Sequence, residues 1–172
     1  MALITGFPPV ADVSARVLIL GSMPGEASLQ ADQYYAHPRN AFWPIMGRLL
    51  GAGPELPYGE RLERLKTAGV ALWDVIGTCE REGSLDARIV AKSVQANDFA
   101  GFFAAHPGVS RVFFNGAAAE TAFRRHVRAV LGESQLAFHR LPSTSPAHAG
   151  MAFAAKLAAW SVVVEIGVSG SV

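Results

Sequence analysis

Two short turns rich in Pro, Gly and Ser hold the residue types best able to do chemistry. The first is Gly21-Ser-Met-Pro-Gly25 and the second is Leu141-Pro-Ser-Thr-Ser-Pro146, and each follows an apolar run. Such residues bring backbone amides close to a ligand. Because open α/β sheets bind ligands at the carboxyl ends of their strands, we predict that the two turns form two sides of one crevice. A crevice of this kind suits an enzyme that acts on a phosphate-bearing polymer.

Two asparagines lie beside predicted turns. Asn40 ends the segment Gln33–Asn40, shortly after the first turn, and Asn115 ends the apolar run that begins at Arg111. A carboxamide presents an acceptor oxygen and two N–H donors, so each Asn is a candidate for binding a polar ligand. Each also comes before a segment with helical spacing, where Asn is a favoured N-cap. From the residues alone, a binding role and a capping role are both open.

The composition predicts a compact protein with a large core. Hydrophobic residues make up 51% of the 172 residues and charged residues 17%, which argues against disorder. A chain of this length is expected to form a single domain over 1–172, with Ser169–Val172 frayed. Cys79 is the only cysteine, which excludes an internal disulfide and a Cys-rich metal site and fits a reducing, cytoplasmic setting. We expect no leader and no membrane span.

Strands and helices are predicted to alternate along the chain. Four apolar runs that end at Gly, Asn or Pro are predicted strands: Val17–Gly21, Val70–Val75, Arg111–Asn115 and Gln135–Leu141. Five segments have helical spacing: Asn40–Leu50, Tyr58–Ala68, Asn97–His106, Gly116–Leu131 and Ala149–Val164. This alternation indicates a three-layer α/β/α fold with a central, mostly parallel four-stranded sheet. The polar segment Thr78–Asp86 is predicted to be a loop over the same sheet edge, either a site wall or a solvated connection.

Five segments, in order along the chain, resemble a known family. They are GSMPG (21–25), QYYAHPRNAFW (33–43), GVALWDVIGTCEREGSLD (69–86), VFFNG (112–116) and LPSTSPAHA (141–149). The series resembles the uracil-DNA glycosylase superfamily, and within it most of all the hypoxanthine-DNA (deoxyinosine) glycosylase branch. The resemblance implies a uracil-DNA glycosylase-like fold and a monofunctional DNA glycosylase that hydrolyses the N-glycosidic bond of deaminated bases in base excision repair. Hypoxanthine is the first expected base, with uracil and xanthine as further ones, and DNA is the expected partner.

The resemblance also implies which residues meet the base. The asparagine of the His-Pro-Arg-Asn segment is catalytic in this branch, which makes Asn40 the expected catalytic residue, with its amide oxygen orienting water. Asn115 is expected to complement the carbonyl and ring N–H of the base, and Tyr35 to stack on it. Many relatives have Asp or Asn at the third position of the first turn, where this chain has a methionine that cannot polarise water. The other base-contacting residues are expected to be Gly21, Ser22 and Met23.

A further set of residues is expected to hold the DNA, since the second turn resembles the phosphate-gripping and wedge loop of the superfamily. Asp74 ends a predicted strand where some relatives have a base-reading Asn, and we expect it to support other site residues instead. No metal or cofactor is expected, and the protein is expected to act as a monomer. The residues expected to contact DNA or its phosphates are Pro24, Gly25, His37, Arg39, Ser143, Thr144, Ser145, Pro146 and His148.

Two other hypotheses stay open at this point. The same fold could bind damaged or single-stranded DNA without cleaving it, because no carboxylate stands in place of Met23. An unrelated small α/β hydrolase would use Ser22 or Ser143 as its nucleophile, although neither lies in a Gly-x-Ser-x-Gly elbow.

Overall fold

A four-stranded parallel sheet forms the centre of the molecule. The computed structural model describes residues 2–168, and the strands of this sheet are β2 (Val17–Gly21), β3 (Val70–Asp74), β6 (Arg111–Asn115) and β7 (Ala137–Leu141). Their order across the sheet is β3-β2-β6-β7, and all neighbours are parallel. β3 lies on one side of β2, and the next strand of the sheet, β6, lies on the other side. The carboxyl ends of β2 and β6 therefore flank the switch point at which such sheets bind ligands.

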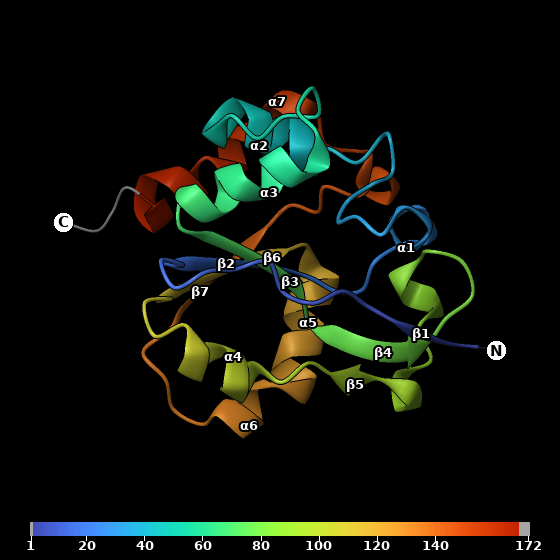
Figure 1. Ribbon diagram of the computed structural model, residues 1–172. Coiled ribbons are helices and arrows are strands. Elements are labelled where there is room, and N and C mark those ends of the chain that lie inside the picture. Colours follow the sequence, from blue (N-terminus) through green and yellow to red (C-terminus); the bar gives the residue numbers. More distant parts are fainter. Residues whose placement is uncertain (1, 169–172) are drawn as a thin grey trace.

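Helices cover both faces of the sheet (Figure 1). Successive residues of β2 point to opposite faces, so Ile19 packs in one core cluster with Phe42 and Trp160, and Leu20 packs in the other with Phe123. This arrangement confirms the predicted three-layer α/β/α class. One face carries α2 (Phe42–Leu50), α3 (Tyr58–Thr67), α7 (Phe153–Trp160) and the π-helical segment η4 (Val163–Val168), and the other carries α4 (Phe99–Ala105), α5 (Ala117–His126) and α6 (Arg128–Leu131).

A small antiparallel sheet, absent from the sequence prediction, lies beside the first turn. Its strands are β1 (Leu3–Thr5), β4 (Ile76–Glu80) and β5 (Gln95–Ala96), in the order β1-β4-β5. The prediction of a loop from Thr78 to Asp86 is therefore wrong for its first three residues, which continue β4. β1 and β5 are too short to show an alternating pattern, which explains why the sequence does not reveal them. Ile76 and Cys79 of β4 pack against Met23 of the first turn.

The helices differ by more than two residues from the predictions mainly in three places. Helix α1 (Glu26–Ala31), directly after the first turn, is not predicted. The helix predicted over Gly116–Leu131 is divided into α5 and α6 at Val127, and the helix predicted from Ala149 begins only at Phe153, after the 3-10 turn η3 (Pro146–His148). Two further 3-10 turns, η1 (Asp86–Arg88) and η2 (Ala91–Ser93), join β4 to β5. The predicted fraying of Ser169–Val172 lies outside the described residues.

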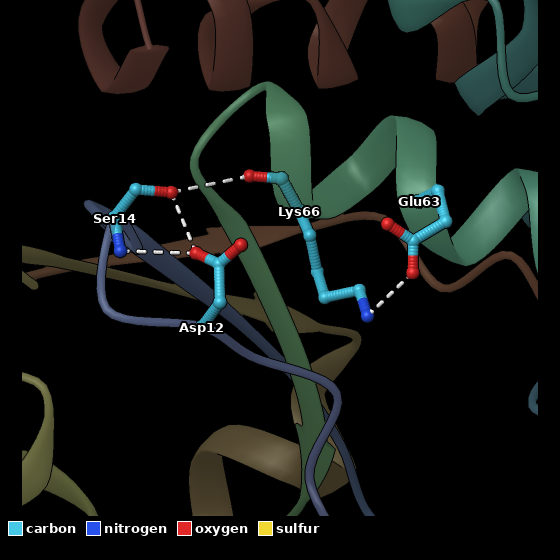
Figure 2. A network of polar contacts seen from close by, with 4 residues as sticks. All are labelled: Asp12, Ser14, Glu63 and Lys66. Carbon is cyan, nitrogen blue, oxygen red and sulfur yellow. Dashed lines mark hydrogen bonds and ion pairs between the residues drawn. The ribbon is translucent and has the colours of Figure 1, made fainter.

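A polar network ties the chain before β2 to the end of α3 (Figure 2). The N–H and hydroxyl of Ser14 donate to Asp12 Oδ1 at 2.9 and 2.6 Å, and the same hydroxyl lies 3.4 Å from the Lys66 carbonyl oxygen. Lys66 Nζ forms an ion pair with Glu63 at 2.7 Å. These residues precede β2 and β3, so the network lies at the opposite end of the sheet from the two turns. Between residues 2 and 168, no helix has the length and apolar character needed to cross a membrane.

Candidate functional site

A cavity of about 140 Å³ lies at the carboxyl ends of β2, β3 and β6, and both turns line it, as the sequence predicts. Gly116 permits the close approach of the second turn to β6. Its φ is +94°, and a Cβ there would lie 3.0 Å from the Ser143 Cβ. Arg39 and His148 are exposed and do not line the cavity. The predicted site residues that line it are Gly21, Ser22, Met23, Pro24, Gly25, Tyr35, His37, Asn40, Asp74, Asn115, Ser143, Thr144, Ser145 and Pro146.

Asn40 lines the cavity and also shapes the start of α2. Its Oδ1 accepts a hydrogen bond from the Phe42 N–H at 2.9 Å, which is an Asx turn. The N-cap of α2 is Ala41, so the predicted cap lies one residue too early. Nδ2 of Asn40 makes no hydrogen bond within residues 2–168, and Oδ1 has a second lone pair. The carboxamide can therefore still bind water or a ligand.

Asn115 holds the second turn in place. Its Oδ1 accepts from the Thr144 N–H at 2.9 Å, and its Nδ2 donates to Thr144 Oγ1 at 2.9 Å. Thr144 is only 1% exposed, and its carbonyl accepts from the Ala41 N–H. Thr144 also lines the cavity, and its hydroxyl accepts from Asn115 without donating to a described residue, so its expected contact with a phosphate stays a prediction. One N–H and one lone pair of the Asn115 carboxamide remain for a ligand.

Tyr35 lies against the end of β2 in an unusual backbone conformation. Its φ is +54°, and its ring stacks on Phe42 with 4.1 Å between centroids. Phe42 is fully buried, so one face of the Tyr35 ring is covered by the core. The Tyr35 hydroxyl is buried; the Asn115 side chain lies close to it, but no described residue makes a hydrogen bond of good geometry with it. A Cβ on Gly21 would lie 2.9 Å from this hydroxyl and would also meet Asp74 Oδ1.

This crowding predicts the effect of Gly21→Ala. The added methyl group would force Asp74 or Tyr35 out of place, and overpacking of this kind costs about 1–3 kcal/mol. We expect a matching loss in the free energy of unfolding, measured by urea titration. Gly59→Ala is the matched control, because nothing lies within 4 Å of a Cβ at that position in α3. An equal effect of the two substitutions would contradict the close contact at Gly21.

Asp74 is a buried carboxyl group in the wall of the cavity. It is 4% exposed, and its Oδ2 has no hydrogen-bond partner among residues 2–168. Burial, together with the negative charge of Asp86, raises the pKa of Asp74 to about 7, and the charge of Arg81 opposes this shift. We expected Asp74 to support other site residues, but no hydrogen bond joins its carboxyl group to a described side chain.

The sequence left two roles open for the loop after β4, and the structure fastens this loop to the first turn and to the start of α1 by three hydrogen bonds. Ser22 Oγ donates to Asp86 Oδ1 at 2.6 Å, and the Glu26 N–H donates to Ser84 Oγ at 2.8 Å. The buried Arg81 donates from Nη2 to the Pro24 carbonyl at 2.7 Å. Ser84 and Asp86 also line the cavity. Of the two readings left open for this loop, the structure favours the site wall.

The two serines of the second turn keep their hydroxyl hydrogens available for an anion. The Ser143 hydroxyl accepts from the Ser145 N–H at 3.1 Å, and the Ser145 hydroxyl accepts from the Ala147 N–H at 3.1 Å. Neither hydroxyl donates to a described residue, so each can donate to a phosphate oxygen. Lys156, which the sequence prediction left out, is buried and donates from Nζ to the His148 carbonyl at 2.8 Å. It holds the segment that follows the turn.

Met23, at the centre of the first turn, is 7% exposed. It packs beneath the turn against β4, and it also lines the cavity. Within residues 2–168, no three His, Cys, Asp or Glu side chains lie close enough together to hold a metal ion. The polar side chains that line the cavity carry carboxamides, hydroxyls, carboxyls and one imidazole.

The fold and the site define an α/β protein whose polar cavity lies at the switch point of a parallel sheet, between two small-residue turns. The model of the uracil DNA glycosylase superfamily matches residues 8–163. The chain belongs to this superfamily, which confirms the resemblance found in the sequence.

Curated and structural relatives agree with this membership. The hypoxanthine DNA glycosylase of Methanosarcina barkeri is 42% identical over 112 residues, which is 64% of this chain and 70% of the relative. The hypoxanthine DNA glycosylase of Methanosarcina acetivorans is 38% identical over the same shares. A solution NMR structure from Methanosarcina acetivorans, described as a candidate uracil DNA glycosylase, has a TM-score of 0.74 and 30% identity, covering 95% of this chain and 99% of that one.

Proposed function

We propose that this protein is a monofunctional DNA glycosylase that hydrolyses the N-glycosidic bond of hypoxanthine in DNA, with uracil and xanthine as further substrates. The observation that carries the proposal is the pair of carboxamides, Asn40 and Asn115, which reach one cavity from distant segments of the chain. Membership of the superfamily supports the same reaction class. The names of the curated relatives support hypoxanthine as the first base.

The chemistry explains why carboxamides suit this task. A base glycosylase must rotate a nucleotide out of the DNA stack before it can break the bond between base and sugar. The transition state combines a cationic sugar with an anionic base, so fixed polar groups near water and base lower the barrier. In the proposal, Asn40 Oδ1 orients the attacking water. The remaining N–H and lone pair of Asn115 complement the carbonyl and ring N–H of hypoxanthine.

DNA would be held on both sides of this cavity. The hydroxyls of Ser143 and Ser145 are the proposed donors to phosphate oxygens, because neither donates to a described residue. The exposed side chains of Arg39 and His148 would contact the DNA outside the cavity. Tyr35 is proposed to stack on the base with the ring face that Phe42 leaves uncovered. As in the sequence interpretation, the protein is proposed to act as a cytoplasmic monomer, with water as its only co-substrate.

DNA binding without cleavage is the second candidate function. Its basis in the sequence is the absence of a carboxylate at position 23. Two carboxyl groups, Asp74 and Asp86, nevertheless line the cavity from other segments, so this argument loses its force.

The decisive experiment is base release from duplexes that contain a single deoxyinosine, deoxyuridine or deoxyxanthosine. We expect abasic sites to form fastest with deoxyinosine and to require no added metal or cofactor. An undamaged duplex of the same sequence is the control. If a folded preparation forms no abasic product from any of the three, the proposed function is wrong; tight binding to the same duplexes would then favour the binding module.

A further inference from the structure

Two buried polar atoms without partners lie in the same wall of the cavity. They are Asp74 Oδ2 and the Tyr35 hydroxyl oxygen, neither of which has a hydrogen-bond partner among residues 2–168. Both side chains meet at Gly21, where a Cβ would contact Asp74 Oδ1 and lie 2.9 Å from the tyrosine oxygen. Buried polar groups in proteins are nearly always hydrogen-bonded, and leaving one unpaired is costly. A partner supplied by a bound ligand would satisfy these atoms.

Most donors and acceptors around Asp74 are bonded elsewhere; the buried exceptions are the Tyr35 hydroxyl and Nη1 of Arg81, which have no partner among residues 2–168. The hydroxyl of Tyr34 donates to the Pro8 carbonyl, and Arg81 donates to the Pro24 and Gly83 carbonyls. Asp86 accepts from Ser22, and its charge opposes a second negative charge at Asp74. No described residue donates a hydrogen bond to the Asp74 carboxyl group, and burial together with the charge of Asp86 favours its neutral, protonated form over the opposing charge of Arg81. The titratable and charged groups near Asp74 are Tyr34, Tyr35, His37, Tyr58, Arg81 and Asp86.

We propose that protonated Asp74 is a catalytic residue that donates its hydrogen to a ring acceptor of the flipped purine. This inference rests on the proposed function. The expected support of other site residues by Asp74 needs a hydrogen bond that the described residues do not make. Asn115 has half of its hydrogen-bonding capacity engaged by Thr144, so a second donor at the base fills a gap in the site.

The reaction balances with this donor. The bond between C1′ and N9 breaks, and its electron pair stays on the purine. The oxygen of water forms the new bond to C1′ and the water proton passes to the solvent. The purine takes the Asp74 proton and leaves as a neutral base, and the Asp74 carboxylate regains a proton from water. A positioned acid of this kind typically contributes a factor of about 100 to 10,000.

The first test is the pH dependence of single-turnover hypoxanthine release. The wild-type rate should fall about tenfold per pH unit once the pH exceeds the pKa near 7, because the ionised carboxyl cannot donate. Asp74→Asn keeps an N–H that can donate a hydrogen bond but cannot transfer a proton and does not titrate, so its rate should be lower than that of the wild type at acidic pH and should lack this alkaline decrease. Asp74→Ala removes the donor and should lower the rate about 100-fold or more at acidic pH. A carboxylate that accepts from the base would instead give a rate that rises through the same pH range, and this result would overturn the proposal.

Stability provides a readout that needs no substrate. The pKa of Asp74 is raised from the ordinary 3.8 to about 7, so its contribution to stability is full below the unfolded value and is lost as the pH rises through about 7. The urea midpoint of the wild type should fall across this range, and the fall should be smaller in Asp74→Asn. This variant also keeps the test open if Asp74→Ala does not fold.

The outcomes separate the two proposals. A folded wild type that releases no base from any substrate overturns the proposed function and the catalytic role together. An active wild type whose alkaline decrease persists in Asp74→Asn overturns the role of Asp74 alone. An Asp74→Ala variant that is folded and as fast as the wild type would also overturn the role of Asp74 alone.

Discussion

Replacing Asn40 with alanine is expected to lower the single-turnover rate of hypoxanthine release by about 100- to 1,000-fold, the size of effect seen when one preorganised polar group is removed from an active site. Asn40 lines the cavity, and its carboxamide keeps a lone pair and both amide hydrogens available after its single hydrogen bond to Phe42. Loss of this group leaves the attacking water without its proposed acceptor. The measurement is abasic-site formation with enzyme in excess over a deoxyinosine duplex.

A second variant separates this effect from the Asx turn at the start of α2. Asn40→Ala also removes the hydrogen bond to the Phe42 N–H, whose loss is expected to cost about 1 kcal/mol of stability. Asn40→Ser keeps a hydroxyl acceptor for that N–H and has no carboxamide. Both variants should be slow, and only Asn40→Ala should show the full loss of stability. A serine variant with the wild-type rate would mean that Asn40 has a structural role only.

The sequence predicts the central sheet well because β2, β3 and β6 are mostly apolar runs that stop at Gly, Asp or Asn, and β7 ends directly before a proline. The bounds of Val17–Gly21 and Arg111–Asn115 agree with the structure residue for residue. The small sheet escapes prediction because β5 has only two residues and the burial of β4 does not alternate regularly. These strands are stabilised by contacts with the first turn, and local sequence carries no signal of such contacts.

The candidate site, like the fold, could be predicted from the sequence only in part. The two turns, Asn40 and Asn115 could be found from residue types and from the resemblance, because small residues after a strand and carboxamides before a helical segment are visible locally. The bonds between Asn115 and Thr144 and between Arg81 and Pro24 could not, since each joins residues at least 29 positions apart. The loop after β4 gave one usable signal of a functional role: it is rich in charged and small residues and follows a predicted strand. Asp74 was noticed, but its lack of partners is visible only in three dimensions.

Asn115→Ala is expected to destabilise the protein by about 1–3 kcal/mol, because it leaves the buried N–H and hydroxyl of Thr144 without partners. The substitution should also slow base release, both by removing the proposed contact with the base and by loosening the second turn. The measurements are urea unfolding and single-turnover base release on the same preparations. A change in unfolding free energy below about 0.5 kcal/mol would contradict the proposed fastening of the second turn.

The matched control is Thr144→Val, which removes the hydroxyl but keeps the shape of the side chain and the bond from the Thr144 N–H to Asn115 Oδ1. Because the two residues are in direct contact, the effects of the single variants on stability should not add in the double variant. If Asn115 also reads the base, Asn115→Ala should lose far more activity than Thr144→Val. Equal losses would assign Asn115 to the positioning of the second turn alone, and the base would then be contacted by Tyr35 and Asp74 without it.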